Sequence, residues 1–488
     1  MKKAALFLCL FLVIILVILG INTIRFTSKQ VRAKPSTGIR VDAQKAAKRL
    51  SEAVTFKTIS TQDPSRMKFE EFIALHNYLE GAFPKAHAVL KKEAVSKYSL
   101  LYKWAGRDDK LKPVILLGHL DVVPVEPGTE GKWTYPAFSG KIADGFIWGR
   151  GTLDLKVNVL GLLEAVENLA AGGFRPKRTM YLAFGHDEEV GGMSGAKKIA
   201  ALLESRGVTA EYVLDEGGFI VEDMMKGITR PVAMVGIAEK GYLSIQLVVE
   251  TVGGHSSMPP RETGIGILSK AIWALEKNPF PRSINGAVKR MFEFLGPEMP
   301  LTNRVALSNL WLLRGMVMGQ LEKSPAMDAL LHTTAAPTML EGSPKENVLP
   351  SRAAGVVNFR ILPGESIKSV TDYVKKTIDD PRVKIEPFTA WAKEPSIVSD
   401  IDSPSFRQIQ KTVAEVFPGS IFAPYLVPGG TDSRNYSGIT KNIFRFTPEQ
   451  LKPDDLKRLH GTNERLSVKN YEEIIRFYIQ LMRNSDSM

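Results

Sequence analysis

The sequence predicts an α/β fold with a mostly parallel central sheet and a smaller inserted α+β domain. Between about residues 41 and 239, short apolar runs alternate with helical patterns, which is typical of strands joined by crossover helices. Near Gly241 apolar and polar residues begin to alternate, as in a strand with one solvent-exposed face. We expect His119 and His460 to meet, and they lie on either side of this second region in the sequence. The second region is therefore predicted to be an insertion.

The chain has 488 residues, which is too long for one ordinary hydrophobic core, so more than one domain is expected. We predict five segments: an N-terminal membrane anchor or signal segment (1–26), a polar linker (27–40), the first part of the larger domain (41–239), the inserted domain (240–365) and the second part of the larger domain (366–488).

Individual elements follow from the spacing of apolar residues. In the larger domain we expect helices over 41–55, 155–171 and 194–206, and buried strands over 113–118, 179–184 and 211–214. In the region after Gly241 we expect strands near 243–249 and 357–361, a helix over 264–277 and another helix starting near Ser366.

The N-terminal apolar run, Ala4 to Ile21, is long enough to span a bilayer. Lys2 and Lys3 precede it, which indicates a cytoplasmic N-terminus with the rest of the chain outside, in the periplasm or the extracellular space. We see no clear cleavage site after the run, so we favour an uncleaved anchor; secretion after signal cleavage is the alternative. Cys9, the single cysteine, lies within this run, so no intrachain disulfide can form.

Composition narrows the class of partner. The net charge is +12, but acidic and basic residues are interspersed and no nucleic-acid recognition motif is evident. We therefore expect no nucleic-acid partner, and an anionic substrate or an anionic membrane surface explains the charge more simply. The stretch 278–336 is rich in Met, Leu, Phe and Trp, and it forms either helical core or a wall for an apolar substrate.

Acid and imidazole side chains stand where the apolar runs stop. They are His119 and Asp121, the pair Glu188 and Glu189, and Asp215; Asp154 in the 149–154 segment and His460 beside Gly461 add to this set. Open α/β sheets place ligands outside the carboxyl ends of their strands, and anions there need a cation to compensate them. Each residue alone has an ordinary structural explanation, but together they supply the ligands of a two-zinc hydrolase without cysteine.

Five longer motifs give the chain a specific resemblance over about residues 45–485. They are GHLDVVP at 118–124, GRGTLD at 149–154, DEEVGG at 187–192, VGGHSS at 252–257 and GGTDSR at 429–434. The chain resembles the co-catalytic zinc exopeptidase family of carboxypeptidase S, aminoacylase-1 and glutamate carboxypeptidase. Within it, VLDEGGFI at 213–220, HTT at 332–334 and VNFR at 357–360 are most similar to the N-fatty-acyl-amino acid synthase/hydrolase branch.

The resemblance implies that the larger domain is the catalytic domain. It also implies roles for the residues of that domain. Asp154 would bridge two zinc ions, His119 and Asp215 would complete one site, and Glu189 and His460 the other. Glu188 would be the general base, with Asp121 behind His119. Co²⁺ or Mn²⁺ could replace zinc, because affinity order does not set occupancy in cells.

The inserted domain would be the family's lid or dimerisation domain, through which a homodimer could form. His255 would stabilise the oxyanion, and Arg360 and Asn347 would hold substrate, with the Gly429 and Gly430 backbone near its carboxylate. His255 could instead cap a helix, and Arg360 could form a surface ion pair. The chain departs from the family pattern at Leu155 and Asn358, where many relatives have acids.

The implied function is zinc-dependent hydrolysis, or reversible formation, of the amide bond of N-acyl amino acids, in particular N-fatty-acyl amino acids. The alternative is a carboxypeptidase S-like carboxypeptidase or dipeptidase. A binding protein without catalysis is disfavoured because Glu188 and the ligand set are intact.

Overall fold

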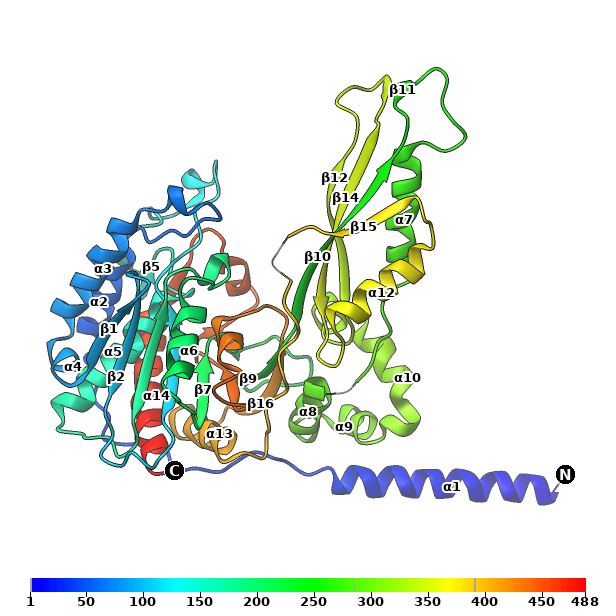
Figure 1. Cartoon of the computed structure of the whole chain (residues 1–488). Coiled ribbons are helices and arrows are strands. Elements are labelled where there is room, and N and C mark those ends of the chain that lie inside the picture. Colours follow the sequence, from blue (N-terminus) through cyan, green and yellow to red (C-terminus); the bar gives the residue numbers. More distant parts are fainter. Residues whose placement is uncertain (1, 285, 390–391) are drawn as a thin grey trace.

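The computed structural model describes residues 2–284, 286–389 and 392–488. Within them, the larger domain is built on a ten-stranded sheet in the order β1-β2-β6-β3-β7-β17-β9-β8-β18, with β16 paired to β9 (Figure 1). The strands are β1 (Lys91–Val95), β2 (Ser99–Trp104), β3 (Val114–His119), β6 (Met180–Gly185), β7 (Tyr212–Asp215), β8 (Ile220–Val221), β9 (Val232–Glu239), β16 (Ile421–Val427), β17 (Ile443–Arg445) and β18 (Gln450–Leu451).

The sheet is mixed, whereas the sequence predicted a mostly parallel one. Strands β6, β3, β7 and β17 run parallel to one another. The antiparallel pairs lie on either side of these four: β1 with β2, β2 with β6, β17 with β9, and β8 with β9. The parallel centre confirms the strand-helix alternation, and its carboxyl ends carry three predicted ligands, His119, Glu189 and Asp215.

Helices cover both faces of this sheet. Alternate residues of β3 enter two different cores: Val114 and Leu116 pack in one, and Ile115 and Leu117 in the other, as the two-residue period of a strand requires. The first core includes α2 (Ala43–Val54), α3 (Phe69–Ala82), α4 (Pro84–Val89), α5 (Lys156–Ala171), α13 (Pro404–Val416) and α14 (Val468–Asp486), and the second includes α6 (Ala196–Ser205). A small sheet of β4 (Ile142–Ala143), β5 (Phe146–Trp148) and β19 (Arg465–Ser467) lies beside them.

The inserted domain is a four-stranded sheet with two helices. Its order is β12-β14-β10-β15, with α7 (Gly264–Lys277) and α12 (Ile367–Ile378). The strands are β10 (Gly241–Glu250), β12 (Thr334–Glu341), β14 (Arg352–Ile361) and β15 (Val383–Pro387). At its tip, β11 (Gly254–His255) pairs with β13 (Val348–Leu349) (Figure 1).

The inserted domain extends beyond the boundary predicted at residue 365. Strand β15 pairs with β10, and Val370, Val374 and Val383 pack in the core of the small sheet. The predicted helix near Ser366 does begin there, since Ser366 caps α12. It belongs to the inserted domain because its apolar face is buried against that sheet and not against the larger one.

A group of helices that lies between β11 and β12 in the sequence is not part of the inserted domain. They are α8 (Gly286–Leu295), α9 (Leu301–Ser308), α10 (Leu310–Leu321) and α11 (Pro325–Asp328). Met291 and Phe294 of α8 are buried in the core of the larger domain, where the Phe294 and Phe406 rings meet edge to face. The core interpretation therefore holds for α8, although the core is that of the larger domain.

The N-terminal segment forms α1 (Lys2–Arg25), a 24-residue helix that extends from the rest of the molecule (Figure 1). It is long and apolar enough to cross a membrane, and its most apolar window is not buried within the protein. Length and composition fit either a signal anchor or a signal peptide. The following residues, predicted to be a linker, have no helix or strand, but they are bonded to the larger domain through Gln30 and Phe422.

Candidate metal centre

Three neighbouring strands bring most of the predicted ligands together. His119 is the last residue of β3 and lies opposite Gly185, the last residue of the parallel strand β6. Glu188 and Glu189 follow β6 in a short 3₁₀ helix, and Asp215 ends β7 on the other side of β3. Parallel strands place their carboxyl ends at one edge, so these groups converge.

Asp154 lies between the two predicted histidine ligands. Its Oδ1 is 3.0 Å from His119 Nε2, and its Oδ2 is 3.0 Å from His460 Nε2. Glu189 Oε2 lies 3.1 Å from the same His460 nitrogen. One carboxylate thus faces two imidazoles with its two oxygens, which is the arrangement that a bridging ligand between two cations requires.

Asp121 holds the surrounding groups in place. His119 Nδ1 donates to the Asp121 carbonyl oxygen at 2.9 Å, which leaves Nε2 directed at Asp154. The Asp121 carboxylate accepts hydrogen bonds from Ser60 Oγ at 2.6 Å and from the backbone N–H groups of Glu188 and Glu189 at 3.1 Å each. Burial alone would raise the pKa of Asp121, but these bonds and His119 hold it below its ordinary value.

The structure places Glu216, and not Asp215, against His119. Glu216 Oε1 is 3.4 Å from His119 Nε2, whereas the Asp215 carboxylate accepts a hydrogen bond from Ser433 N at 2.7 Å. The sequence interpretation did not select Glu216. The available signal was its position, because it directly follows the last residue of a buried parallel strand.

We call the following group of side chains the Asp154 cluster: His119, Asp154, Glu188, Glu189, Glu216 and His460. The Asp154 cluster suits a divalent cation. Ligand atoms of His119, Asp154 and Glu189 lie within 4.8 Å of one another, as do those of His119, Glu188 and Glu216. Glu189 Oε1 is buried and has no hydrogen-bond partner among the described residues. Burial, and then the charge of Asp154, raises the pKa of Glu216 to about 8. Imidazole and carboxylate are the ligands that zinc accepts without thiolates, and a cation would relieve this crowding of acids.

A buried ion pair connects the two loops that carry Asp154 and His460. Arg150 Nη1 lies 2.5 Å from Glu464 Oε2, and Arg150 Nη2 donates to the His460 carbonyl oxygen at 3.1 Å. The other Glu464 oxygen accepts the backbone N–H groups of Gly151, Leu153 and Asp154. Sequence reasoning missed Glu464, since the structure brings it to Asp154 from 310 residues away.

The predicted substrate residues at the base of the inserted domain lie near a second arginine. Burial and the charge of Arg434 lower the pKa of Arg360, whose guanidinium lies 4.9 Å from the centre of the Tyr242 ring. Gly430 belongs to the loop after β16, and a Cβ atom there would overlap the Arg434 side chain. Gly429 has open space in the same loop.

His255 and Asn347 lie together at the opposite end of the inserted domain. Ser256 N donates to the Asn347 carbonyl oxygen at 3.2 Å, and the exposed His255 ring is bonded to Ser257. Strand β11, which carries His255, is at the tip and away from the central sheet (Figure 1). The structure therefore does not bring these two predicted residues to the Asp154 cluster.

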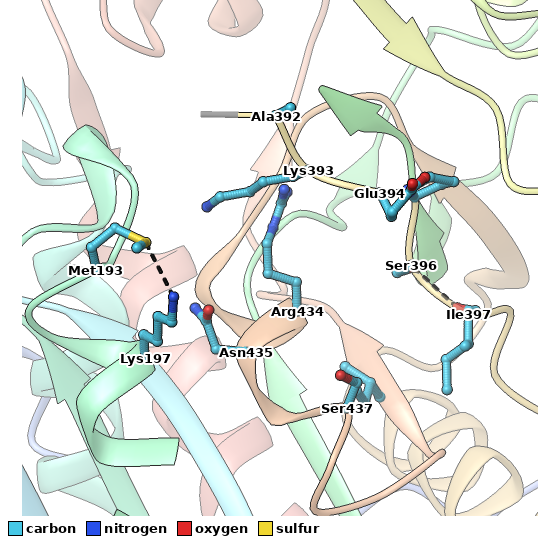
Figure 2. Close-up of a pocket in the computed structure, with 12 residues that line it drawn as sticks. Met193, Lys197, Ala392, Lys393, Glu394, Ser396, Ile397, Arg434, Asn435 and Ser437 are labelled. Atoms are coloured by element: carbon cyan, nitrogen blue, oxygen red, sulfur yellow. Dashed lines mark hydrogen bonds between the residues drawn. The ribbon is translucent and has the colours of Figure 1, made fainter. Parts of the chain in front are cut away.

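A cavity of about 610 Å³ lies beside the Glu188 turn. Figure 2 shows Lys393 and Arg434 side by side in this cavity, with Lys197 across from them. Lys393 Nζ donates to the Gly191 carbonyl oxygen at 3.0 Å, so it borders the turn that carries Glu188. None of the described residues that line the cavity is a predicted metal ligand.

The fold is that of known metallopeptidases. The chain superimposes on human carnosine dipeptidase 1 with a TM-score of 0.63 and 17% identity, covering 91% of this chain and 97% of that one. It matches a metallo-carboxypeptidase of Sulfolobus solfataricus with a TM-score of 0.64 and 18% identity, over 92% and 100%. At these identities the likeness establishes the fold alone.

Sequence comparison gives the family. The model of peptidase family M20/M25/M40 matches residues 115–484, and the chain belongs to this family. It is therefore a hydrolytic enzyme.

The relatives of this chain carry the names of two activities, carboxypeptidase and N-fatty-acyl-amino acid synthase/hydrolase. The chain is 43% identical to a probable carboxypeptidase S-like protein of Dictyostelium discoideum, over 97% of this chain and 92% of that one. It is 42% identical to the N-fatty-acyl-amino acid synthase/hydrolase of Danio rerio, over 89% and 84%. It is 32% identical to carboxypeptidase S of Saccharomyces cerevisiae, over 89% and 83%.

Proposed function

We propose that this chain hydrolyses, and in reverse forms, the amide bond between a fatty acyl group and an amino acid, with two zinc ions. The observation that carries the proposal is the position of Asp154 between His119 and His460, with Glu188 on the neighbouring turn. Relatives that are N-fatty-acyl-amino acid synthase/hydrolases, at 37–42% identity, support the substrate class.

The metal ions would be held by His119, Asp154, Glu189 and His460, with Asp215 or the adjacent Glu216 as the remaining ligand. Bound there, they would supply Lewis acidity toward water and the substrate carbonyl. The Glu188 carboxylate takes a proton from the attacking water and delivers it to the amide nitrogen as the C–N bond breaks. Asp121 positions Glu188 through its backbone N–H.

The amino acid half of the substrate carries a carboxylate, which Arg360 would bind. Arginine can grip a carboxylate with two parallel hydrogen bonds. Gly429 and Gly430 would allow the backbone to approach the same group. Arg434 lies next to both and adds positive charge, although the ion pair with Glu239 at 3.0 Å neutralises it in part.

His255 and Asn347 can take their proposed roles only if the tip of an inserted domain meets a metal site. Both lie on the tip of the inserted domain, so the site of this chain would receive them only after a domain movement or from a second copy. We favour a homodimer formed through the inserted domain. Its edge strand β12 supports this, because Met339 and Leu340 are exposed on it and unpaired edges readily pair with another chain.

The proposed location is the outer face of a membrane, with α1 as an uncleaved anchor. Lys2 and Lys3 precede the apolar run, and basic residues favour the cytoplasmic side. Secretion after cleavage of α1 is the alternative. Fractionation with N-terminal sequencing distinguishes them, because a mature chain that starts after residue 20 excludes the anchor.

A second candidate is a carboxypeptidase or dipeptidase with the same metal chemistry. It is favoured by the carboxypeptidase S-like relative of Dictyostelium discoideum, at 43% identity. The two candidates differ only in what fills the acyl side of the site, a long apolar chain or a polar peptide.

A substrate panel separates the two candidates. The purified enzyme is assayed on acetyl, octanoyl and oleoyl derivatives of phenylalanine and on dipeptides, with Glu188→Gln as the inactive control. Each buried methylene can add about 0.8 kcal/mol of binding, so kcat/KM should rise with chain length. A flat or falling series, with faster cleavage of dipeptides, would reject the fatty-acyl proposal.

A further inference from the structure

Helix α10 exposes an apolar surface that the described residues of the chain leave uncovered. Its sequence, LWLLRGMVMGQL, contains a single charged residue, Arg314. Trp311 is 58% exposed, Met316 is 61% exposed and Leu312 is also exposed. Exposed apolar side chains gathered on one helix indicate a binding surface, since scattered single residues are the usual case.

The start of α10 is bonded to the end of the apolar helix α1. Asn22 Nδ2 donates to Asn309 Oδ1 at 2.9 Å, and Asn309 Nδ2 donates to the Leu19 carbonyl oxygen at 3.3 Å. Thr23 is buried against this junction, where its hydroxyl lies 3.1 Å from Ser308 Oγ. Figure 1 shows α9 and α10 next to the C-terminal end of α1.

These contacts determine how deep α10 would lie in a membrane that α1 crosses. The apolar run from Ala4 to Ile21 has 18 residues, or about 27 Å at 1.5 Å per residue, close to the ~30 Å hydrocarbon core of a bilayer. If α1 spans that core, Leu19 to Thr23 lie where it emerges. Trp311 follows the Asn309 contact by two residues, so it would lie at the membrane–water boundary, which tryptophan prefers.

The segment after α1 prevents the larger domain from moving away. Phe26 packs directly over Gly296, where even a Cβ atom would not fit. Lys29 forms a 2.9 Å ion pair with Glu293. The Gln30 amide exchanges two hydrogen bonds with the Phe422 backbone, at 2.8 and 3.0 Å. A flexible tether would leave α10 free to face water, but this docked segment keeps it beside α1.

We propose that the exposed face of α10 lies in the lipid bilayer next to α1, as an interfacial helix. The occupant of this surface is lipid, since the surface is continuous with the helix that is apolar enough to cross a membrane. Arg314, which is exposed on the same helix, can extend to the phosphate groups. The enzyme would then be held by two elements in a defined orientation. This inference rests on the proposed anchoring of the chain by α1, and it does not depend on the proposed substrate.

The test uses the full-length chain reconstituted in phosphatidylcholine vesicles. Cys9, the only cysteine, is replaced by serine, and Leu312→Cys or Met316→Cys is labelled with an environment-sensitive fluorophore. Lipids with a quencher near the headgroup should strongly reduce the emission of both labels. The control Lys85→Cys lies on α4, at the opposite side of the molecule from α1 (Figure 1), and should not be quenched.

Two outcomes would overturn the proposal. Quenching of the Leu312→Cys label by iodide in water, and not by lipid, would show that α10 faces solvent. Protection from both quenchers, with a disulfide between Leu312→Cys copies, would assign the surface to a second chain. Unchanged thermal unfolding of each variant ensures that the labelled proteins are folded.

Discussion

The Asp154 cluster and the tip of the inserted domain both carry residues assigned to one reaction, but the protein holds them in opposite ways. In the cluster, His119 is 1% exposed and is bonded through both ring nitrogens. At the tip, His255 is exposed and its ring is bonded to Ser257, two residues away. His460 is partly exposed, but its ring is bonded to Asp154 and Glu189, and such a bonded cluster is organised before substrate arrives. A solvent-exposed histidine on a two-residue strand can act only when another surface meets it.

Removal of metal should give the largest effect, because it removes the centre of the cluster. Dialysis of the active enzyme against a chelator should abolish hydrolysis, and zinc should restore it. Metal analysis of the active enzyme should find two ions per chain. Full activity in a preparation without divalent metal would contradict the assignment of the cluster.

The next largest effect should come from Glu188→Gln. A general base contributes about 10²–10⁴-fold to rate, and glutamine keeps the shape of the side chain without its basicity. We expect this loss in kcat while both metals stay bound, whereas the exposed control Glu70→Gln should be normal. Near-normal turnover would exclude Glu188 as the base.

His255→Ala tests the other half of the comparison. Loss of one oxyanion donor costs about 10²–10³ in kcat, and metal content should not change because the tip lies outside the cluster. His460→Ala should instead reduce metal binding. Equal metal loss in both variants would show that the tip and the cluster are not separate.

Co-expression of two variants tests whether a second copy of the chain supplies His255. If a second copy supplies His255, mixed dimers of His255→Ala and Glu188→Gln chains should recover activity that neither variant has alone, because one site then contains both residues. If the inserted domain of the same chain closes instead, the mixture should stay inactive.

The smallest effect is expected for Arg360→Ala. A hydrogen bond to a charged group is worth about 1.5–3 kcal/mol, or roughly ten- to a hundredfold in kcat/KM. The loss should appear for N-acyl amino acids and be absent for their amides, with Arg360→Lys intermediate. An equal loss for acid and amide would mean that Arg360 does not bind the carboxylate.

Elements that depend on near neighbours could be predicted from sequence. The helix expected over 264–277 is α7, Gly264–Lys277, and the strand expected over 113–118 is β3, Val114–His119. Helix and strand periods are properties of a few consecutive residues. The positions of His119, Glu188 and Asp215 at strand ends followed from the same local patterns, and so did their convergence at one edge of a parallel sheet.

Several partners from distant parts of the chain were decided only by the tertiary structure. Glu464 supports the Asp154 loop, Glu216 faces His119 in place of Asp215, and β15 completes the inserted sheet. Sequence motifs also grouped His255 with the metal ligands, although the fold holds it at the far tip of that sheet. The physical reason is that pairing across a sheet and burial of a long loop depend on the whole packed chain, and local sequence does not encode these partners.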